Sequence, residues 1–148
     1  MTLYNDDFIN VLPLLSNNSI DCVICDTPYN ATSINWDKDL DWKFIWKELD
    51  RICKPSANKI FFSQGLFMAK LINSNPKEFK YDLIWDKNKC GSPGLAHYRP
   101  QKVHENILVF NKGVGIYNPI MEDGEPYHRV CKDKEKGYGT GKNSHGYG

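Results

Sequence analysis

Four residues that could do chemistry, Asp26-Thr27-Pro28-Tyr29, follow directly after an apolar run that ends at Cys25. The carboxylate of Asp26 can accept hydrogen bonds from an amine, which makes the nitrogen more nucleophilic and stabilises charge developing on it. The alternative is purely structural, because an aspartate close to a proline is also typical of an Asx-type turn. The tetrapeptide by itself leaves a reactive site and a simple turn equally open.

The segment 87–104 is basic and contains no acidic residue. Its cationic and histidine side chains are Lys87, Lys89, His97, Arg99, Lys102 and His104. Two glycines and two prolines within it indicate a flexible loop, which would suit contacts to phosphate groups. A merely solvated loop is the alternative. We interpret His104 as a structural residue at the entrance of a strand.

The five cysteines are irregularly spaced and odd in number, which predicts reduced thiols: Cys22, Cys25, Cys53, Cys90 and Cys131. Cys22 and Cys25 form a C-x-x-C pair inside a strand-like run, where positions three apart point to opposite faces. Such a pair cannot hold one ion, so we predict core cysteines there. A zinc module that adds His97 and His104 matches no standard spacing, and we predict no metal site.

Strand-like and helical patterns alternate along the chain. The candidate strands are residues 2–5, 20–25, 58–63, 81–85 and 105–110, and the candidate helices are residues 6–15, 41–54 and 65–73. This alternation predicts a mostly parallel sheet with helices on both faces, in which ligands bind at the carboxyl ends of the strands. The run 20–25 is typical of a central strand buried on both faces. Asp26 to Tyr29 would then stand where such proteins carry their chemistry.

Composition sets limits on the partners. The net charge is +1, from 19 basic and 18 acidic residues, so contacts to a polyanion must come from local patches. No apolar run approaches the roughly 18 to 20 residues of a membrane helix, and no leader pattern is present, which predicts a cytoplasmic protein without membrane contact. With 41% hydrophobic residues in 148, we expect one compact core.

The tetrapeptide resembles the Asp/Asn/Ser-Pro-Pro-aromatic motif of the DNA amino-methyltransferase family, in the subgroup whose motif precedes the cofactor loop. The similarity extends over roughly residues 3 to 128. It is carried by Asp6-Asp7, the run 19–25, Asn35-Trp36-Asp37, the run 51–55, Leu83-Ile84-Trp85, the run 104–110 and Asn111-Lys112. Thr27 departs from the usual proline of the motif.

The resemblance implies a partial Rossmann-like α/β fold of S-adenosylmethionine-dependent methyltransferases. It implies transfer of a methyl group to N6 of adenine in DNA, because an aspartate at the first motif position is typical of adenine enzymes. Asp26 and the main-chain carbonyl of Thr27 would accept the two N–H groups of the target amine. Tyr29 would stack on a base flipped out of the duplex. Threonine can still offer its carbonyl, and Pro28 restricts it to extended conformations.

The resemblance also assigns binding residues. We expect Asp7, Asp26 and Tyr29 to contact S-adenosylmethionine, Pro28 to complete the catalytic motif, and DNA to be bound by Asn30, Trp36, Lys87, Lys89, Arg99 and Lys102. Residues 1–113 would form the catalytic part. Residues 114–148 would begin a target-recognition segment, with disorder as the alternative for this glycine-rich tail.

Two segments of the resembled subgroup have no counterpart in the sequence: a His-Pro-Thr-Gln-Lys-Pro-like segment and an Asp-x-Phe-x-Gly-x-Gly-like strand and turn. We therefore expect the N-terminal portion of a methyltransferase without its main cofactor loop. The alternative is a truncated or split relic that only binds nucleic acid. Either way apolar sheet surface should be exposed, unless a second chain or copy covers it.

Overall fold

The computed structural model describes residues 1–29, 39–91 and 93–124. The chain divides into two units, residues 1–117 and 118–148, and every helix and strand of the described residues belongs to the first unit. The expected boundary between residues 113 and 114 stays a prediction. The account below concerns the first unit.

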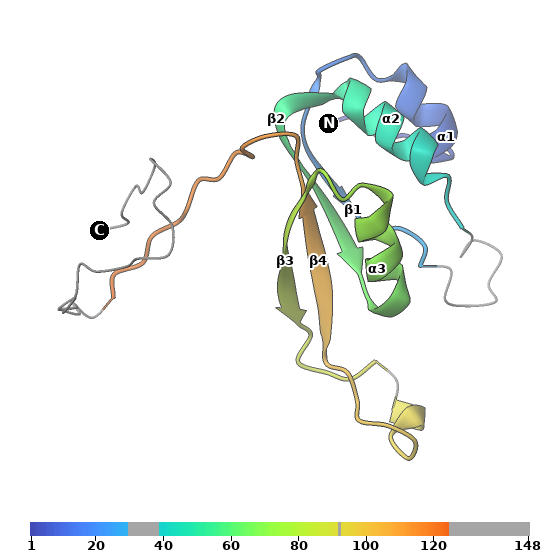
Figure 1. The fold of residues 1–148 in the computed structure, drawn as a ribbon, viewed down its shortest axis with the longest axis vertical. Coiled ribbons are helices and arrows are strands. Elements are labelled where there is room, and N and C mark those ends of the chain that lie inside the picture. Colours follow the sequence, from blue (N-terminus) through green and yellow to red (C-terminus); the bar gives the residue numbers. More distant parts are fainter. Residues whose placement is uncertain (30–38, 92, 125–148) are drawn as a thin grey trace. The chain divides into compact units, whose positions relative to one another are not determined.

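Figure 1 shows the elements of this unit. In chain order they are α1 (Phe8–Val11), the 3-10 helix η1 (Leu12–Leu14), β1 (Ile20–Cys25), α2 (Trp42–Ile52), β2 (Cys53–Ser63), α3 (Gly65–Ser74), β3 (Phe79–Asp86), η2 (Pro93–Leu95) and β4 (His104–Phe110). The strand expected at residues 2–5 is wrong, since these residues form no ladder. The helix expected at 6–15 is broken in two, because Pro13 has no N–H to continue it.

The sheet has the order β1-β2-β4-β3. β1 and β2 are parallel, and β4 runs antiparallel to both β2 and β3. Three of the four strands therefore point the same way. Their carboxyl ends lie together at one end of the sheet, which we call its carboxyl edge (Figure 1). β4 begins at that same edge. This confirms the predicted α/β fold class. The sheet is mixed, because one of the three ladders among the described strands is parallel and two are antiparallel.

β1 is an edge strand of this sheet, which corrects the expectation of a central strand. Among the described strands it pairs with β2 alone, and Ile24 is 69% exposed. Cys22 is also exposed, so the prediction of a core cysteine is wrong for this residue. Cys25 is half-buried, and burial, followed by the nearby charge of Asp26, raises the pKa of its thiol.

The core lies between one face of the sheet and helices α2 and α3. Asp41 begins α2 by accepting hydrogen bonds from the N–H groups of Lys43 and Phe44, 3.0 and 3.1 Å long. The apolar stripe of α2 and the side chains Phe67 and Leu71 of α3 pack on Phe61 of β2 and on Leu108 and Phe110 of β4. Aromatic contacts connect α2 to the sheet, through Trp46 with Phe61 and Phe110, and α2 to α3, through Trp42 with Phe67.

The opposite face of the sheet carries no helix of the described residues, which corrects the expectation of cover on both faces. The register places Ile24, Tyr81, Leu83 and Trp85 on this face, and they are between 46% and 69% exposed. Exposed apolar surface was expected from the sequence, and these side chains bear it out. What covers the face stays a prediction.

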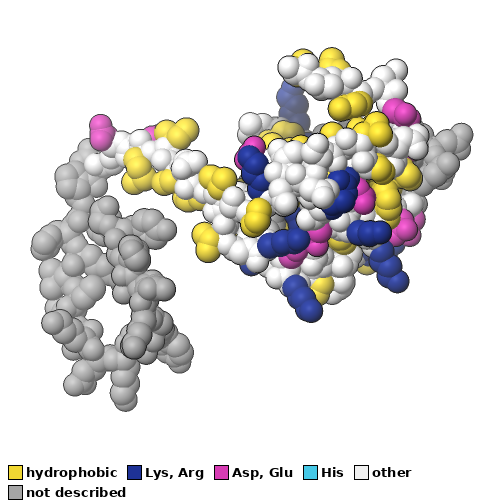
Figure 2. All heavy atoms as spheres, turned by 90° about the horizontal axis from the view of Figure 1, so that it is seen from above, with side chains coloured by type: hydrophobic (Ala, Val, Ile, Leu, Met, Phe, Trp, Pro, Cys, Tyr) yellow, Lys and Arg dark blue, Asp and Glu magenta, His cyan; other side chains and the backbone are white. Residues whose placement is uncertain are grey.

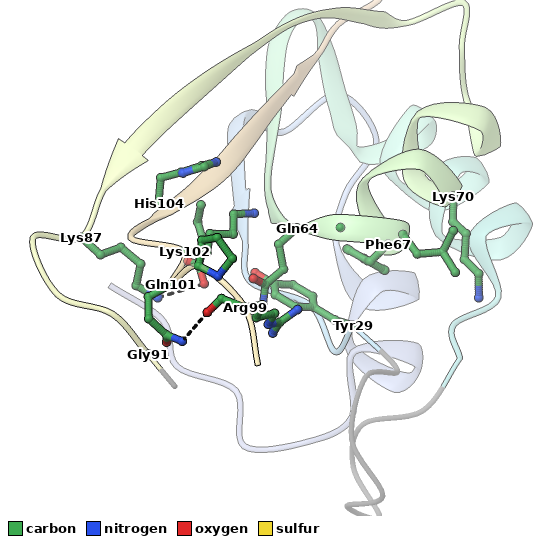
Figure 3. Close-up of a pocket in the computed structure, with 14 residues that line it drawn as sticks. Tyr29, Gln64, Phe67, Lys70, Lys87, Gly91, Arg99, Gln101, Lys102 and His104 are labelled. Carbon is green, nitrogen blue, oxygen red and sulfur yellow. Dashed lines mark hydrogen bonds and ion pairs between the residues drawn. The ribbon is translucent and has the colours of Figure 1, made fainter. Parts of the chain in front are cut away.

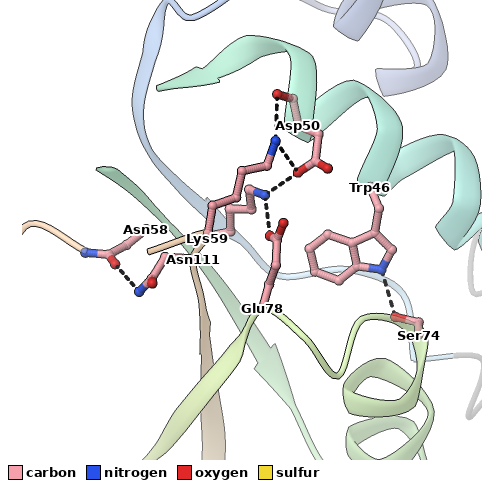
Figure 4. Close-up of polar contacts among 8 residues, drawn as sticks. Trp46, Asp50, Asn58, Lys59, Ser74, Glu78 and Asn111 are labelled. Carbon is pink, nitrogen blue, oxygen red and sulfur yellow. Dashed lines mark hydrogen bonds and ion pairs between the residues drawn. The ribbon is translucent and has the colours of Figure 1, made fainter. Parts of the chain in front are cut away.

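A buried lysine connects α2 to the sheet. Lys59 of β2 is 1% exposed, and its Nζ lies 2.7 Å from Oδ1 of Asp50 and 2.7 Å from Oε2 of Glu78 (Figure 4). Burial alone would lower the pKa of Lys59, but the two carboxylates outweigh it and raise the pKa. The cation also lies 5.8 Å from the ring centre of Trp46. Lys59 is therefore a charged member of the folded core.

Two asparagines attach the segment that follows β4 to β2. Asn111 donates a 3.1 Å hydrogen bond to Asn58, which itself donates a 2.8 Å bond to the carbonyl of Ile116 (Figure 4). A Cβ at Gly115 would lie 1.9 Å from Oδ1 of Asn58. Only glycine permits this approach, so the bend at residue 115 requires this residue type.

Candidate functional site

The carboxyl edge of the sheet brings together segments that are far apart in the sequence. Cys25 pairs with Phe61 in parallel register, so the residues after β1 continue beside those that end β2. On the other side Asp86 pairs with His104, and the N–H of Lys87 donates a 2.8 Å hydrogen bond to the carbonyl of Val103. The acidic motif and the basic loop, separate in sequence, therefore flank one edge.

A cavity of about 660 Å³ opens at this edge, and Figure 3 shows its lining. We call it the edge cavity. It is lined by Tyr29 after β1, by Gln64, Gly65, Leu66, Phe67 and Lys70 at the start of α3, and by Lys87, Gly91, Arg99, Pro100, Gln101, Lys102, His104 and Glu105 from the loop between β3 and β4 and from β4 itself. A volume of this size is in the range of small-molecule sites.

Tyr29 carries the motif into the edge cavity. Its hydroxyl donates a 3.0 Å hydrogen bond to Oδ1 of Asp26, and its ring stacks on Phe67 with centres 4.9 Å apart and an angle of 25° between the planes. Burial, followed by the hydrogen bond to Asp26, raises the pKa of the phenol well above its usual value. Tyr29 is therefore a neutral, oriented aromatic surface at pH 7.

The other motif residues lie next to the edge cavity rather than in its lining. Asp26 is exposed, and its carboxylate faces the hydroxyl of Tyr29. Thr27 has a buried Oγ1 without a hydrogen-bond partner among the described residues. The motif stands at the carboxyl end of its strand, as expected, although that strand is an edge strand. The catalytic roles of the four residues remain predictions.

The cations expected to bind DNA are not equivalent. Arg99 and Lys102 line the edge cavity, whereas Lys89 does not. Lys87 lines it too, but its Nζ lies 2.9 Å from Oε1 of Glu105 and 5.5 Å from the ring centre of Trp85. Its charge is therefore already partnered. On the surface seen in Figure 2, described Lys and Arg side chains are interspersed with Asp and Glu.

Several residues of the edge cavity were not predicted from the sequence, among them Lys70 and Gln64. Lys70 follows Phe67 by one turn of α3, so both lie on the same side of the helix. Gln64 ends the connection from β2 to α3 and also faces the cavity. The helical spacing of Phe67 and Lys70 was visible in the sequence. Nothing there connected α3 to the motif, because the parallel pairing of β1 with β2 makes that connection.

One expected site residue, Asp7, lies elsewhere, and two others cannot be placed. Asn30 and Trp36 fall outside the described residues. Asp7 caps α1, where Oδ1 accepts a 3.0 Å hydrogen bond from the N–H of Ile9, and it is not in the lining of the edge cavity. Within the described residues no cluster of histidine, cysteine or acidic side chains could hold a metal ion, and no helix is long and apolar enough to cross a membrane.

The edge cavity has more cations than carboxylates in its lining. Its cationic lining includes Lys70, Arg99 and Lys102, none of which has a carboxylate within ion-pair distance among the described residues. A sulfonium cation would be repelled there, whereas a phosphate would be attracted.

No family model matches the sequence. The fold, however, is similar to solved structures of DNA methyltransferases. One is M1.HpyAVI in complex with SAM, at a TM-score of 0.58 and 17% identity over 82% of this chain and 62% of that one. Another is the cytosine-N4-specific PvuII DNA methyltransferase, at 0.58 and 16% identity over 76% and 49%. The chain shares part of their fold.

A third similar structure comes from Thermus thermophilus and is proposed to be a DNA modification methylase. It has a TM-score of 0.56 and 20% identity, over 77% of this chain and 53% of that one. The chain thus spans between 49% and 62% of the length of these three structures. At such identities the likeness concerns the fold, and the activity has to be argued from the site.

Proposed function

We propose that the chain is part of a DNA methyltransferase that transfers a methyl group from S-adenosylmethionine to N6 of adenine. The observation that supports this most directly is the position of Tyr29. It is stacked and neutral inside a cation-lined cavity, with its hydroxyl bound to the carboxylate of Asp26. A nucleotide with an exocyclic amine needs an aromatic ring to stack on, a carboxylate to hold its amine and cations to contact its phosphates.

Asp26 would activate the amine. The nitrogen of an aminopurine is a poor nucleophile because its lone pair is delocalised into the ring. Hydrogen bonds from both N–H groups to fixed acceptors favour a more nucleophilic nitrogen. Tyr29 occupies Oδ1 of Asp26, but a carboxylate offers about four lone-pair sites, so Asp26 retains capacity for an amine. The carbonyl of Thr27 is our proposed second acceptor.

The edge cavity would hold the extruded nucleotide. A base taken out of the duplex is held by stacking and by contacts to its edge. Tyr29, supported from behind by Phe67, would supply the stacking surface. Arg99, Lys102 and Lys70 would contact the flanking phosphates, which carry most of the affinity of proteins for DNA.

The proposal leaves the cofactor outside the edge cavity. S-adenosylmethionine supplies the methyl group when bound, and M1.HpyAVI, which shares the fold, is a SAM complex. We assign no described residue to hold it, because Asp7 caps α1 and the edge cavity is cationic. The part played by Asp26 and Tyr29 is to hold and orient the target base.

A second candidate function is nucleic-acid binding without methyl transfer. It is favoured by one observation: residues of this chain alone form the edge cavity, with its stacked aromatic pair and its cations. The two candidates differ in whether a methyl group appears on DNA.

The test is methyl transfer by the natural full-length protein, with S-adenosylmethionine and genomic DNA from a strain that lacks DNA methylation. Nucleoside mass spectrometry should find N6-methyladenine. N4-methylcytosine instead would retain the enzyme class but refute the adenine assignment, and no methylated base would leave the binding function. Asp26→Ala should abolish transfer and change DNA affinity only a few fold. Asp21→Ala, which removes an exposed carboxylate from the same strand, should leave transfer unchanged.

A further inference from the structure

Gln64 is placed to read the target base, although nothing in the sequence pointed to it. It follows the last residue of β2 and precedes the first residue of α3. Because Cys25 pairs with Phe61, the chain that leaves β1 with the motif continues beside the end of β2. Gln64 and Tyr29 thus leave two neighbouring parallel strands at the same edge. Figure 3 shows the side chain of Gln64 in the same space as Tyr29.

Among the described residues, no hydrogen bond engages the amide of Gln64. Gln64 is the N-cap residue of α3, with φ −156° and ψ 156°, yet its side chain makes no capping hydrogen bond. Glutamine is not a preferred N-cap residue, since serine, threonine, aspartate and asparagine hold the free N–H groups far better. Gly65, with φ +55°, then starts the helix sharply. Helix stability therefore does not explain the glutamine at position 64, whereas a contact with a ligand in the edge cavity would.

The other cavity glutamine shows the contrast. Nε2 of Gln101 donates a 3.3 Å hydrogen bond to the carbonyl of Arg99, so this amide holds the shape of its own loop. Both glutamines line the edge cavity, but only Gln64 stands next to the stacked pair of Tyr29 and Phe67. A base lying on Tyr29 would therefore share the edge cavity with the amide of Gln64.

We infer that Gln64 is a specificity-determining residue, whose Nε2 donates a hydrogen bond to an unprotonated ring nitrogen beside the amino-bearing carbon of the target base. The inference rests on the proposed function. With the amine held by Asp26, the neighbouring ring nitrogen of adenine is an acceptor. In guanine and thymine the oxygen that replaces the amine faces the carboxylate, and the adjacent ring nitrogen carries a hydrogen. The acceptor beside a held amine thus separates amino bases from keto bases.

Adenine has two ring nitrogens that accept hydrogen bonds on the side of its amino group: N1, which is bonded to the amino-bearing carbon, and N7, which is bonded to the next ring carbon. The inference concerns N1, so 1-deazaadenine is the base that should bind more weakly. Single-atom replacement distinguishes the two nitrogens. The protein is titrated by fluorescence anisotropy with short oligothymidylates that carry one central adenine, 1-deazaadenine, 7-deazaadenine or thymine. Single strands avoid the free-energy cost of opening a duplex. Wild-type protein should bind adenine best, and 1-deazaadenine should lose about threefold to tenfold in affinity, the range of one neutral hydrogen bond.

The decisive variant is Gln64→Met, which keeps the length of the side chain and removes its donor. It should bind the adenine strand as weakly as wild-type protein binds the 1-deazaadenine strand, and should no longer distinguish the two. Lys70→Ala is the matched control from the same helix. It should weaken all four strands equally and preserve the preference, because a phosphate contact does not depend on the base.

Three outcomes would overturn the inference. The first is that wild-type protein binds 1-deazaadenine as tightly as adenine, a result that needs no variant at all. The second is that Gln64→Met, or Gln64→Ala if the first variant fails to fold by circular dichroism, retains the full preference for adenine over 1-deazaadenine. In both cases a wild-type preference for adenine over thymine would leave the proposed function intact. Equal binding of adenine and thymine by wild-type protein would instead refute the base-holding role of the edge cavity, and the inference with it.

Discussion

The hydroxyl of Tyr29 donates a hydrogen bond of 3.0 Å to Oδ1 of Asp26, so the aromatic and the acidic member of the motif hold each other. This contact holds the phenol ring against Phe67, and it involves only one of the two carboxylate oxygens of Asp26. Tyr29 therefore contributes in two ways: its ring offers a stacking surface, and its hydroxyl orients the carboxylate of Asp26.

The two contributions of Tyr29 can be measured separately. Tyr29→Phe keeps the ring stacked on Phe67, and we expect its affinity for single-stranded DNA to stay within about twofold, because one exposed hydrogen bond contributes little. Tyr29→Ala removes the stacking surface and should lose about fivefold or more, since base stacking contributes about 1–3 kcal/mol. Anisotropy titrations give both values. Equal losses in the two variants would mean that the ring does not stack on a base.

The phenol of Tyr29 should also make stability depend on alkaline pH. Burial, then Asp26, raises the pKa of Tyr29 in the folded chain, so the unfolded chain loses this proton first as the pH rises. The resulting stabilisation is fully present below the unfolded pKa of about 10 and is lost above it. The urea midpoint of wild-type protein should therefore fall more steeply above that pH than the midpoint of Tyr29→Phe. Tyr98→Phe, which removes an exposed phenol, is the control.

The cations of the edge cavity should differ in their effect on binding. Lys70→Ala, Arg99→Ala and Lys102→Ala should each weaken single-stranded DNA binding and reduce the salt dependence of the affinity by about 0.7 per lost phosphate contact. Lys87→Ala should do less, because Lys87 is paired with Glu105. Lys47→Ala on the exposed side of α2 is the matched control. If Lys87→Ala had the largest effect, the pairing would not describe the DNA-bound state.

Lys59 should dominate the electrostatic contribution to stability. Lys59→Met leaves Asp50 and Glu78 facing each other without their buried cation, which should lower the free energy of unfolding by about 3 kcal/mol or more. Lys54→Ala breaks the more exposed pair with Asp21 and should cost less than about 1 kcal/mol. Urea unfolding followed by circular dichroism measures both. Similar small losses would show that the cluster is not desolvated.

The 148-residue chain should not bind S-adenosylmethionine at micromolar concentrations. Its edge cavity is cationic, the carboxylate of Asp7 is engaged as a helix cap, and the sequence has no glycine-rich turn between an apolar strand and a helix. Calorimetric titration should give no saturable heat, while the same sample binds single-stranded DNA. Saturable heat at one-to-one stoichiometry would contradict this prediction.

Much of the local structure could be predicted from the sequence, because it depends on local patterns. The spacing of apolar residues predicted a helix over residues 41–54, and α2 spans Trp42–Ile52. The position of Asp26 to Tyr29 after a strand was predicted for the same reason. The roles of these residues in catalysis remain predictions.

What could not be predicted depends on pairing between distant segments. An apolar run such as 20–25 is typical of a central strand, and only the strand order shows that β1 lies at the edge. Likewise, no local sequence pattern indicates that β4 runs antiparallel to β2 and β3 and lies between them. Lys70 and Gln64 were missed because the pairing of β1 with β2, rather than sequence proximity, brings α3 to the motif.

The central place of β4 has a consequence for how the chain is made. β3 pairs with β4 alone among the described strands, so a nascent chain that has reached only residue 103 carries β3 without a ladder partner. The edge cavity, which needs Tyr29 from one side and His104 and Glu105 from the other, is assembled last. Contacts that span so much of the sequence fold slowly. The ribosome must therefore release almost the whole first unit before the edge cavity exists, and exposed apolar side chains make such a partly made chain prone to aggregation.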